Sequence, residues 1–413
     1  MRRERLVVGL DVGTTKVACL VANVVDDFIE IIGMGMAPSR GLEKGVVVDI
    51  GRTIQSIRKA VEEAENMADV KVESAYVGIA GKHIRSLNNS ATVSITRPDR
   101  IITAEDVRRV VEAARTMPLA PDVELIHVIP RQYIVDGQEG ITDPVGMTGT
   151  RLEVDVHIVM GSVTAVHNLV RCVEALGISI AQIVLEPLAS SMAVLSSAEK
   201  ELGVVLLDCG GGTTDLSVFR GGDIWFSKTI PIAGEHITND ITVGLQTPIE
   251  EAERIKKAYG TCLVDAVGDE EKIEVATIGG EGTKTVSRKK LAKIIEPRVE
   301  EILDLAMQEV EDAGYRDLIP AGMVITGGTA LLDGMVEFAQ RRYGIPARRG
   351  SIPQGIHGLR DIVESPVFAT GIGLLKYAVE GRDFVRSKRS RSGVAGGGMF
   401  NKLFRWFRKF LRG

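Results

Sequence analysis

Apolar residues gather in short runs along the chain, and two of these runs repeat one pattern. Residues 5–24, RLVVGLDVGTTKVACLVANV, predict an apolar strand, a turn at Gly13 to Thr15 and a second apolar strand. Residues 203–219, GVVLLDCGGGTTDLSVF, give the same order of strand, aspartate, glycine-rich turn with paired threonines, and strand. The two aspartates, Asp11 and Asp208, lie 197 residues apart. Such a copy indicates a duplicated protein with two similar domains that face each other.

The remaining stretches have helical or strand-like patterns. Helices are predicted at residues 52–68, 103–117, 248–260 and 287–314. Thr103, with Asp106 three residues later, fits a variant of the capping box at the start of the second of these. Strands are predicted at 124–135 and 151–162, on either side of a glycine-rich turn region, so residues 84–162 are expected to form a small α+β insertion. Residues 324–335, VITGGTALLDGM, predict a strand, a glycine turn and the start of a helix.

The composition is typical of a globular protein. At roughly 100–200 residues per domain, 413 residues predict two to four structural units. With 45% hydrophobic residues the chain has ample apolar surface to bury, and it holds no run of 18 or more apolar residues of the kind that crosses a bilayer. Gly9 and Asp11 interrupt the first apolar run, which argues against a secretory signal and predicts a cytoplasmic protein. The 4 cysteines lack C-x-x-C spacing and the 6 histidines are scattered, so neither disulfides nor a zinc site is expected.

The two glycine-rich turns carry residue types that bind phosphate. The first glycine loop (residues 13–15) and the second glycine loop (residues 210–213) combine glycine, which permits close backbone approach, with N–H groups and threonine hydroxyls that donate to oxyanions. A structural hairpin is the alternative for one such turn alone. The second copy favours a ligand, since three successive glycines carry an entropic cost that a simple hairpin does not require. Two opposed loops are able to enclose a triphosphate from both sides.

Two aspartates and a third loop add to this site. Asp11 and Asp208 stand at the strand ends beside the glycine loops, where carboxylates hold a hydrated Mg²⁺, because Mg²⁺ keeps several waters and needs few protein ligands. The alternative for each is an aspartate that caps a turn. The third loop, T-G-G-T at residues 326–329, predicts a close approach of the backbone to a flat ring or a ribose, although a G-G turn by itself is mostly structural.

In this order, the three loops resemble the phosphate-1, phosphate-2 and adenosine motifs of the actin, Hsp70 and sugar-kinase ATPase superfamily. The resemblance implies an α/β fold of the actin-like, ribonuclease H-like duplicated kind, with two lobes that bind ATP and Mg²⁺. The implied nucleotide-binding positions are Asp11, Gly13, Thr14, Thr15, Lys16, Asp208, Gly210, Gly211, Gly212, Thr213, Thr214, Asp215, Gly327, Gly328 and Thr329. Mg²⁺ is expected at Asp11 and Asp208, through water.

Three further segments fit the superfamily by position. Residues 183–195, IVLEPLASSMAVL, resemble the segment near the attacking water, which places Glu186 in the water-orienting position; otherwise Glu186 caps a helix that begins at Pro187. Residues 251–260, EAERIKKAYG, resemble the helix that contacts the adenosine, and they imply contacts from Glu253, Lys256 and Lys257. A solvated helix face is the alternative there. Residues 367–378, VFATGIGLLKYA, resemble the small-residue hinge helix.

Within the superfamily, essentially the whole chain is similar to the FtsA family of bacterial cell-division proteins. The similarity lies in the insertion, in SAYVGIAGKHI before it, in GEHITNDITVGL and EAERIKKAYG, and in a basic amphipathic segment at residues 399–413. An Hsp70 chaperone would need a large peptide-binding domain after the ATPase, and a sugar kinase is normally longer. The family has an actin-like fold without subdomain 1B and with a differently placed subdomain, 1C. The resemblance implies lobe 1 (1A) at 1–83 and 163–200, subdomain 1C at 84–162, and lobe 2 (2A/2B) at 201–384.

The charge distribution sets the last residues apart from the rest. No acid follows Asp383, while nine Lys or Arg residues do, which leaves 41 basic against 55 acidic residues in the body. Residues 385–398, VRSKRSRSGVAGGG, predict a flexible basic linker. Residues 399–413, MFNKLFRWFRKFLRG, hold five of the chain's Phe, Trp and Tyr residues. The split between an acidic body and a basic tail indicates an anionic partner for the tail.

A helix over 399–413 has two distinct faces at 100° per residue. Its apolar face is Met399, Phe400, Leu403, Phe404, Trp406, Phe407, Phe410 and Leu411, and its basic face is Lys402, Arg405, Arg408, Lys409 and Arg412. At about 22 Å the helix is too short to span a bilayer of roughly 30 Å, so it is expected to lie in the membrane interface. Packing on the body and binding of nucleic acid are the alternatives. The glycine-rich tether argues against the first, and the clean apolar face against the second.

The sequence therefore predicts an ATP-binding, actin-like cell-division protein with at most slow ATP hydrolysis. The resemblance implies self-assembly, attachment of FtsZ filaments to the cytoplasmic face of the inner membrane, and recruitment of later division proteins through residues 84–162. It points to lobe 2 for the FtsZ peptide, with Arg288, Lys290 and Arg298 as candidate contacts. The alternatives are an ATPase or phosphotransferase with real turnover, in which Glu186 orients the nucleophile, and a pilus-assembly actin relative, which is not expected to carry this tail.

Overall fold

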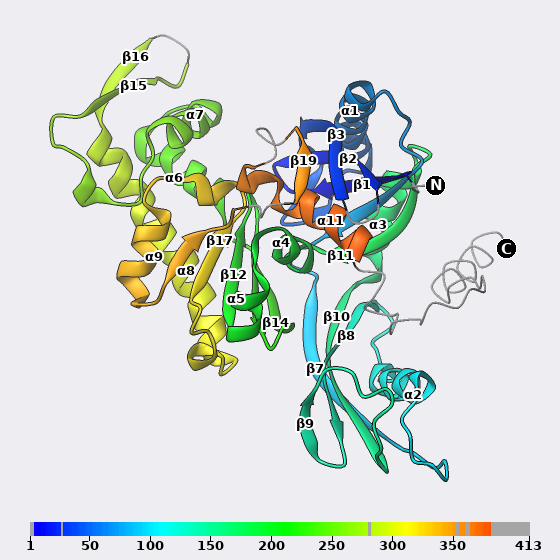
Figure 1. Ribbon diagram of the computed structural model, residues 1–413. Coiled ribbons are helices and arrows are strands. Elements are labelled where there is room, and N and C mark those ends of the chain that lie inside the picture. Colours follow the sequence, from blue (N-terminus) through cyan, green and yellow to red (C-terminus); the bar gives the residue numbers. More distant parts are fainter. Residues whose placement is uncertain (1–3, 26–27, 280–281, 352–354, 360–363, 381–413) are drawn as a thin grey trace. The chain divides into compact units, whose positions relative to one another are not determined.

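The computed structural model describes residues 4–25, 28–279, 282–351, 355–359 and 364–380 (Figure 1). The predicted linker at 385–398 and the predicted membrane helix at 399–413 lie outside the described residues. Within the described part, no helix is both long enough and apolar enough to cross a membrane.

The first lobe contains a six-stranded sheet in the order β11-β6-β1-β2-β3-β19. Its strands are β1 (Glu4–Val12), β2 (Lys16–Val25), β3 (Phe28–Pro38), β6 (Ser74–Ile79), β11 (Ser179–Leu185) and β19 (Ile356–Gly358). β1, β2 and β3 form an antiparallel meander, and β6 and β11 continue the sheet as parallel strands beside β1. Residues 17–22 of β2 are all fully buried. The apolar run predicted from the sequence therefore forms a central strand covered on both faces.

Helices cover this sheet on both faces. α1 (Ile50–Ala68) packs on β2 and β3, and its N-cap Asp49 accepts a hydrogen bond of 3.0 Å from the Arg52 N–H. α11 (Ala369–Glu380) and α4 (Glu186–Val194) pack together on the other face. β1 and α11 approach closely at Gly9, where a Cβ would lie 2.7 Å from the Gly371 carbonyl oxygen. The absence of a side chain at Gly9 therefore permits this packing. The lobe also contains α3 (Val163–Glu174) and a short hairpin, β4 (Leu42–Glu43) and β5 (Val46–Val47), whereas α5 (Ser197–Leu202) packs against β13 (Thr214–Arg220) of the second lobe.

The second lobe repeats the topology of the first. Its sheet has the order β14-β13-β12-β17-β18, with β12 (Val204–Cys209), β13 (Thr214–Arg220), β14 (Asp223–Ile230), β17 (Met323–Thr326) and β18 (Ala347–Arg349). β12, β13 and β14 form the meander, and β17 joins β12 in parallel, as β6 joins β1. The two sheets thus confirm the duplication predicted from the paired glycine loops.

Among the described residues, the second lobe contains four further α-helices and a hairpin. The helices are α6 (Gly234–Leu245), α7 (Ile249–Tyr259), α8 (Arg288–Asp312) and α9 (Met335–Tyr343), and the hairpin is β15 (Lys272–Ala276) with β16 (Thr283–Ser287). α7 and α8 confirm the helices predicted at 248–260 and 287–314, with slightly shorter bounds. The β15–β16 hairpin was not expected from the sequence.

The insertion is a separate four-stranded sheet with one helix. Its strand order is β7-β10-β8-β9, with β7 (Arg85–Ser94), β8 (Val123–Val135), β9 (Gln138–Ile141) and β10 (Arg151–Ser162). α2 (Ala104–Arg115) contacts β7 and β10 (Figure 1). The predicted capping box is present: the Thr103 N–H donates to the Asp106 carboxylate at 2.9 Å, and Thr103 and Arg97 help to hold the pKa of Asp106 at about 2 against the opposing effect of burial. The apolar residues of this sheet form their own core with α2.

Buried histidines join the insertion to both lobes. On the first-lobe side, the Leu185 N–H donates to His127 Nε2 at 3.0 Å, immediately before Glu186 in the chain. On the second-lobe side, the His157 ring is hydrogen-bonded to Asn88 at 2.8 Å and to Ser227 of β14 at 3.0 Å. The insertion is thus hydrogen-bonded to the end of β11 in the first lobe and to β14 in the second lobe.

Candidate nucleotide site between the two lobes

The two glycine loops are equivalent turns in equivalent hairpins. In the first loop, the Gly13 N–H donates to the Lys16 carbonyl at 3.0 Å, and in the second the Gly210 N–H donates to the Thr213 carbonyl at 2.9 Å. Asp11 lies in β1 two residues before the first loop, and Asp208 lies in β12 two residues before the second. Both loops are therefore closed by the same type of backbone hydrogen bond, from residue i to residue i+3, as expected for the two copies.

The loops of the two lobes face each other at contact distance. A Cβ added to Gly212 would lie 2.7 Å from both Cγ2 and Oγ1 of Thr14, and one added to Gly211 would collide with Thr15. Any residue larger than glycine at position 211 or 212 would therefore require the threonines of the opposite loop to move. The predicted residues Thr14, Thr15, Gly211 and Gly212 are therefore brought together, although 196 or more positions separate the two pairs in the sequence.

Four carboxyl groups gather beside the loops, and three of them act on one ammonium group. Asp11, Asp208 and Asp215 are 4%, 9% and 4% exposed, and Glu186 is partly buried among them. Lys16 forms an ion pair with Asp11. Burial lowers the pKa of Lys16, but the charges of Asp11, Asp208 and Glu186 outweigh that effect and raise it. The lysine is thus held in its charged form.

The carboxyl groups themselves carry more negative charge than Lys16 neutralises. Burial, together with the charge of Asp11, raises the pKa of Asp208 to about 6. Burial also raises the pKa of Asp215 to about 7, although Thr229 Oγ1 donates to this carboxylate at 2.6 Å. Such shifts mean that the cluster favours an added positive charge or an added proton.

The third loop closes against the second. Thr329 Oγ1 donates to the Gly210 carbonyl at 2.7 Å. Gly327 has a φ of 83°, and a Cβ there would lie 2.5 Å from Asp208 Oδ1, so both the backbone conformation and the space require glycine. Gly328 follows at the start of a 3₁₀ turn, residues 328–331. The three loops predicted to share one ligand therefore meet at one place.

The predicted adenosine helix also reaches this place. Lys256, on α7, donates to the Gly234 carbonyl at 3.0 Å, and Gly234 is hydrogen-bonded to Gly210 at 3.2 Å. Glu253 forms ion pairs with Lys256 at 2.6 Å and with Lys257 at 3.0 Å. Burial raises the pKa of Glu253, but Lys256, Thr238 and Lys257 together outweigh burial, so the pKa falls to about 2. Lys257 is exposed, so Glu253 and Lys256 are the members of this set that border the loops.

Glu186 is the first residue of α4, with Pro187 next in the first turn. A Cβ added to Gly78 of β6 would lie 3.2 Å from Glu186 Oε1, so the glycine leaves room for the carboxyl group. Burial and then the charges of Asp11, Asp215 and Asp208 raise the pKa of Glu186 well above its ordinary value. The arrangement places a weakly acidic carboxyl group beside the three aspartates, which suits a group that takes part in proton transfer.

The three candidate cations for the FtsZ peptide do not form one patch. Arg288 is paired with Glu271 at 2.8 Å, and Arg298 with Asp240 at 2.6 Å. Lys290 is exposed. At about 100° per residue, Lys290 lies on the opposite side of α8 from Arg288. These residues share a helix but not a face.

Several contacts at the site were not predicted. Thr370 Oγ1 of α11 donates to Asp208 at 3.3 Å, Thr229 holds Asp215, and Thr238 Oγ1 donates to Glu253 at 2.6 Å. Single threonines outside any glycine-rich turn give no sequence signal of such a role. Within the described residues, no group of three or more His, Cys, Asp or Glu side chains has the geometry to hold a metal ion directly.

Comparison with known proteins identifies the family. A model of the cell division protein FtsA matches residues 205–373, and a model of the SHS2 domain inserted in FtsA matches residues 81–160. The chain is 45% identical to cell division protein FtsA of Pseudomonas aeruginosa over 377 residues, which cover 91% of this chain and 90% of that protein. The chain belongs to the FtsA family of cell division proteins. It is also 42% identical to the FtsA of Neisseria meningitidis and 38% identical to that of Escherichia coli K12, with 98% of each chain covered.

Solved structures show the fold of this FtsA-family chain. The PilM–PilN type IV pilus biogenesis complex matches with a TM-score of 0.67 at 16% identity, over 91% of this chain and 98% of that one. MreB5 of Spiroplasma citri bound to ADP matches with a TM-score of 0.55 at 16% identity, over 92% and 97%. The predicted actin-like fold is therefore correct. The sequence identities to the FtsA relatives decide against the pilus-assembly alternative, since the likeness to PilM is one of fold alone.

Proposed function

We propose that this FtsA-family protein binds ATP with Mg²⁺ between its two lobes. The observation that carries the proposal is the meeting of three glycine loops from both lobes at a cluster of four carboxyl groups and one lysine. Glycine backbone N–H groups suit phosphate oxygens, and the excess of buried carboxyl groups suits a hydrated cation. When bound, Mg²⁺ would neutralise phosphate charge, with Asp11 and Asp208 holding its waters. The solved MreB5 structure bound to ADP supports a nucleotide in this fold.

A nucleotide test uses full-length protein and isothermal titration calorimetry with ATP, with and without Mg²⁺. Asp208→Asn keeps the side-chain shape but removes the charge that attracts Mg²⁺, so its affinity for Mg·ATP should fall by about tenfold or more, a loss of about 1.4 kcal/mol. Asp317→Asn changes an exposed aspartate in the second lobe and serves as the matched control. Equal affinities in Asp208→Asn and wild type would contradict the metal assignment, and no heat of binding in wild type would contradict the nucleotide site.

The protein is further proposed to act on the cytoplasmic face of the inner membrane. The support is the sequence of residues 399–413, whose predicted helix has a fully apolar face opposite five cations. Deletion of 399–413 is expected to abolish sedimentation with anionic liposomes and to leave ATP affinity unchanged. A truncated protein that still pelleted with liposomes would show that the membrane contact lies elsewhere.

Self-assembly, FtsZ tethering and recruitment of later division proteins through residues 84–162 complete the proposal. A double helical filament of MamK, a protein of the same fold, supports assembly of actin-like subunits. For the FtsZ peptide, Lys290 is the sharpest probe, because it is exposed whereas Arg288 and Arg298 pair with neighbouring acids. Lys290→Ala should weaken binding of an acidic FtsZ C-terminal peptide without lowering the melting temperature. Arg298→Ala should lower the melting temperature slightly, since it leaves Asp240 without this ion pair.

A second candidate function is ATP hydrolysis with true turnover. The raised pKa of Glu186 favours it, since enzymes raise the pKa of a carboxyl group by burial and neighbouring charges when that group serves as a general acid or base. Steady-state phosphate release separates the two proposals. Turnover faster than about 1 s⁻¹, within the ordinary range of enzymes, would favour the enzyme, and slower release would favour the ATP-controlled adaptor.

A further inference from the structure

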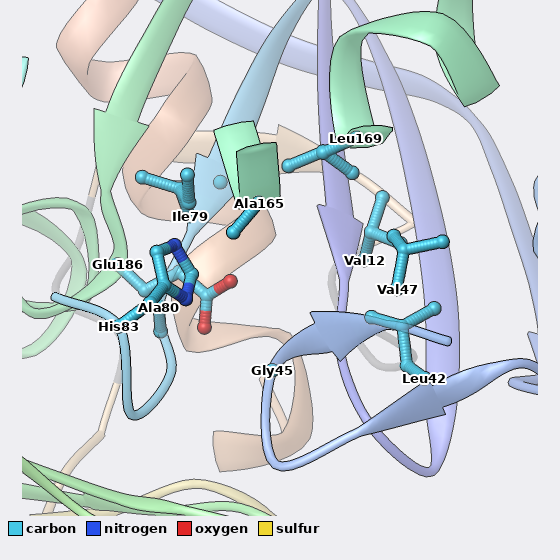
Figure 2. Close-up of a pocket in the computed structure, with 11 residues that line it drawn as sticks. Val12, Leu42, Gly45, Val47, Ile79, Ala80, His83, Ala165, Leu169 and Glu186 are labelled. Carbon is cyan, nitrogen blue, oxygen red and sulfur yellow. The ribbon is translucent and has the colours of Figure 1, made fainter. Parts of the chain in front are cut away.

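A small pocket lies next to Glu186 on the side of the first lobe (Figure 2). Val12, Ala165 and Leu169 contribute to apolar walls, and the β4–β5 hairpin closes another side through Gly45. Of the side chains that line it, only His83 and Glu186 are polar, and Figure 2 shows both at the same end of the pocket. The space open to the centre of a water molecule is about 10 Å³, which is the size needed for one water.

Both ring nitrogens of His83 are buried and lack a hydrogen-bond partner among the described residues. Burial lowers the pKa of His83, so the ring is neutral and offers one donor and one acceptor. A buried polar group without a partner destabilises the fold, and one bound water would supply a partner to one of the two nitrogens. The turn that carries His83 is held by a hydrogen bond of 3.0 Å from the Ile84 N–H to the Gly81 carbonyl.

The pocket shares its walls with the nucleotide site. Val12 precedes the first glycine loop, and the Gly45 N–H donates to Thr14 Oγ1 at 3.2 Å. Glu186 faces Asp11, Asp208, Asp215 and Lys16 on the other side. The position of the Glu186 carboxyl group is therefore set between the charged cluster and this pocket.

We propose that His83 and Glu186 together bind one water molecule in this pocket, and that His83, through this water, fixes the orientation of the Glu186 carboxyl group. His83 is then a positioning residue for Glu186. The effect of His83 on ATP hydrolysis rests on the proposed nucleotide function. The water site itself does not depend on a bound nucleotide.

The test compares full-length wild type with His83→Leu, which removes both nitrogens, and with His83→Gln, which keeps a donor and an acceptor. His357→Leu changes an exposed histidine of the first-lobe sheet and is the matched control. ATP affinity and the single-turnover rate of phosphate release are measured for each protein. His83→Leu should keep its ATP affinity within about twofold and should release phosphate about tenfold more slowly, the usual size of such an indirect effect. His83→Gln should recover most of the rate, and His357→Leu should match wild type.

Crystal structures of wild type and His83→Leu provide a readout independent of activity. An ordered water within hydrogen-bond distance of both the His83 ring and the Glu186 carboxyl group is expected in wild type and not in His83→Leu. A dry pocket in wild type, or a direct His83–Glu186 hydrogen bond, would overturn the site. Equal rates in all four proteins, or equal losses in His83→Leu and His83→Gln, would overturn the positioning role. Absence of ATP binding in wild type would refute the nucleotide proposal and leave the crystal structures to decide the water site.

Discussion

At the scale of single residues, the site depends on how little space separates the glycine loops. Gly212 is in contact with Thr14 of the opposite lobe, so a methyl group there must displace the threonine or separate the loops. Gly212→Ala is expected to weaken ATP binding by about tenfold or more, because overpacking of this kind costs about 1–3 kcal/mol. Gly51→Ala is the matched control, since a Cβ there meets its nearest atom only at 3.5 Å. Titration calorimetry of both variants gives the comparison, and equal affinities would mean that the loops do not hold the phosphates.

Residue types also explain which site positions the sequence revealed. Glycine loops with paired threonines have a recognisable chemistry, and their two copies pointed to Asp11, Asp208 and their neighbours. Thr370 and His83 have no such signal: each is an ordinary residue whose role depends on the group it meets. Thr370 lies 162 positions from Asp208, and only the packing of α11 brings the two together.

At the scale of elements, the hydrogen bonds that join the insertion to the two lobes involve two neutral histidines, His127 and His157. Burial lowers the pKa of His157 to about 3 and that of His127 to about 4, from 6.5. Arg131 and His127 also disfavour the charged form of His157. Between these values and pH 6.5 the unfolded chain binds more protons than the folded one, so stability is lost as the pH falls through this window. At pH 5 the loss is about 2 kcal/mol for each histidine.

Trp225 provides a local probe of this pH dependence. It lies in β14 at the junction, with the Arg131 guanidinium 3.9 Å from its ring centroid. In a Trp406→Phe background, Trp225 is the remaining tryptophan, and its emission should report loosening of the junction as the pH falls from 7 to 5. His157→Gln should flatten the change, whereas His357→Gln, which alters an exposed histidine, should not. The same change with pH in all three proteins would falsify the role of His157.

At the scale of the whole molecule, closure of the two lobes should be linked to nucleotide. A ligand that binds only the folded state stabilises it by RT ln(1 + [L]/Kd), or about 2.7 kcal/mol at a hundredfold excess over Kd. Mg·ATP should therefore raise the melting temperature of the full-length protein, and Asp208→Asn should reduce this rise. Differential scanning fluorimetry with Mg·ATP, with ATP in EDTA and without ligand measures the effect. An identical melting temperature in all three conditions would argue against a ligand between the lobes.

The proposed membrane attachment also belongs to the scale of the whole molecule. Each cation of the predicted helix contributes up to about 1 kcal/mol near an anionic leaflet, and salt screens this attraction. Replacement of Lys402, Arg405, Arg408, Lys409 and Arg412 by Gln should therefore abolish the preference for anionic over neutral vesicles. Trp406→Glu, on the apolar face, should weaken binding to both kinds of vesicle. If the Gln variant kept its lipid preference, the basic face would not be the membrane contact.

The sequence by itself determined the duplication, the three loops and the two faces of the predicted terminal helix, because each depends on local residue order and short-range periodicity. It also predicted an α+β insertion, since the strands and the helix there have clear patterns of their own. Only the tertiary structure decided that Thr14 meets Gly212, that Lys16 lies near three carboxyl groups, and that His83 and Glu186 share one pocket. It also separated Lys290 from Arg288 on α8. These relations join residues far apart in the chain or on opposite helix faces, and the packing of two lobes, which no local pattern encodes, sets them.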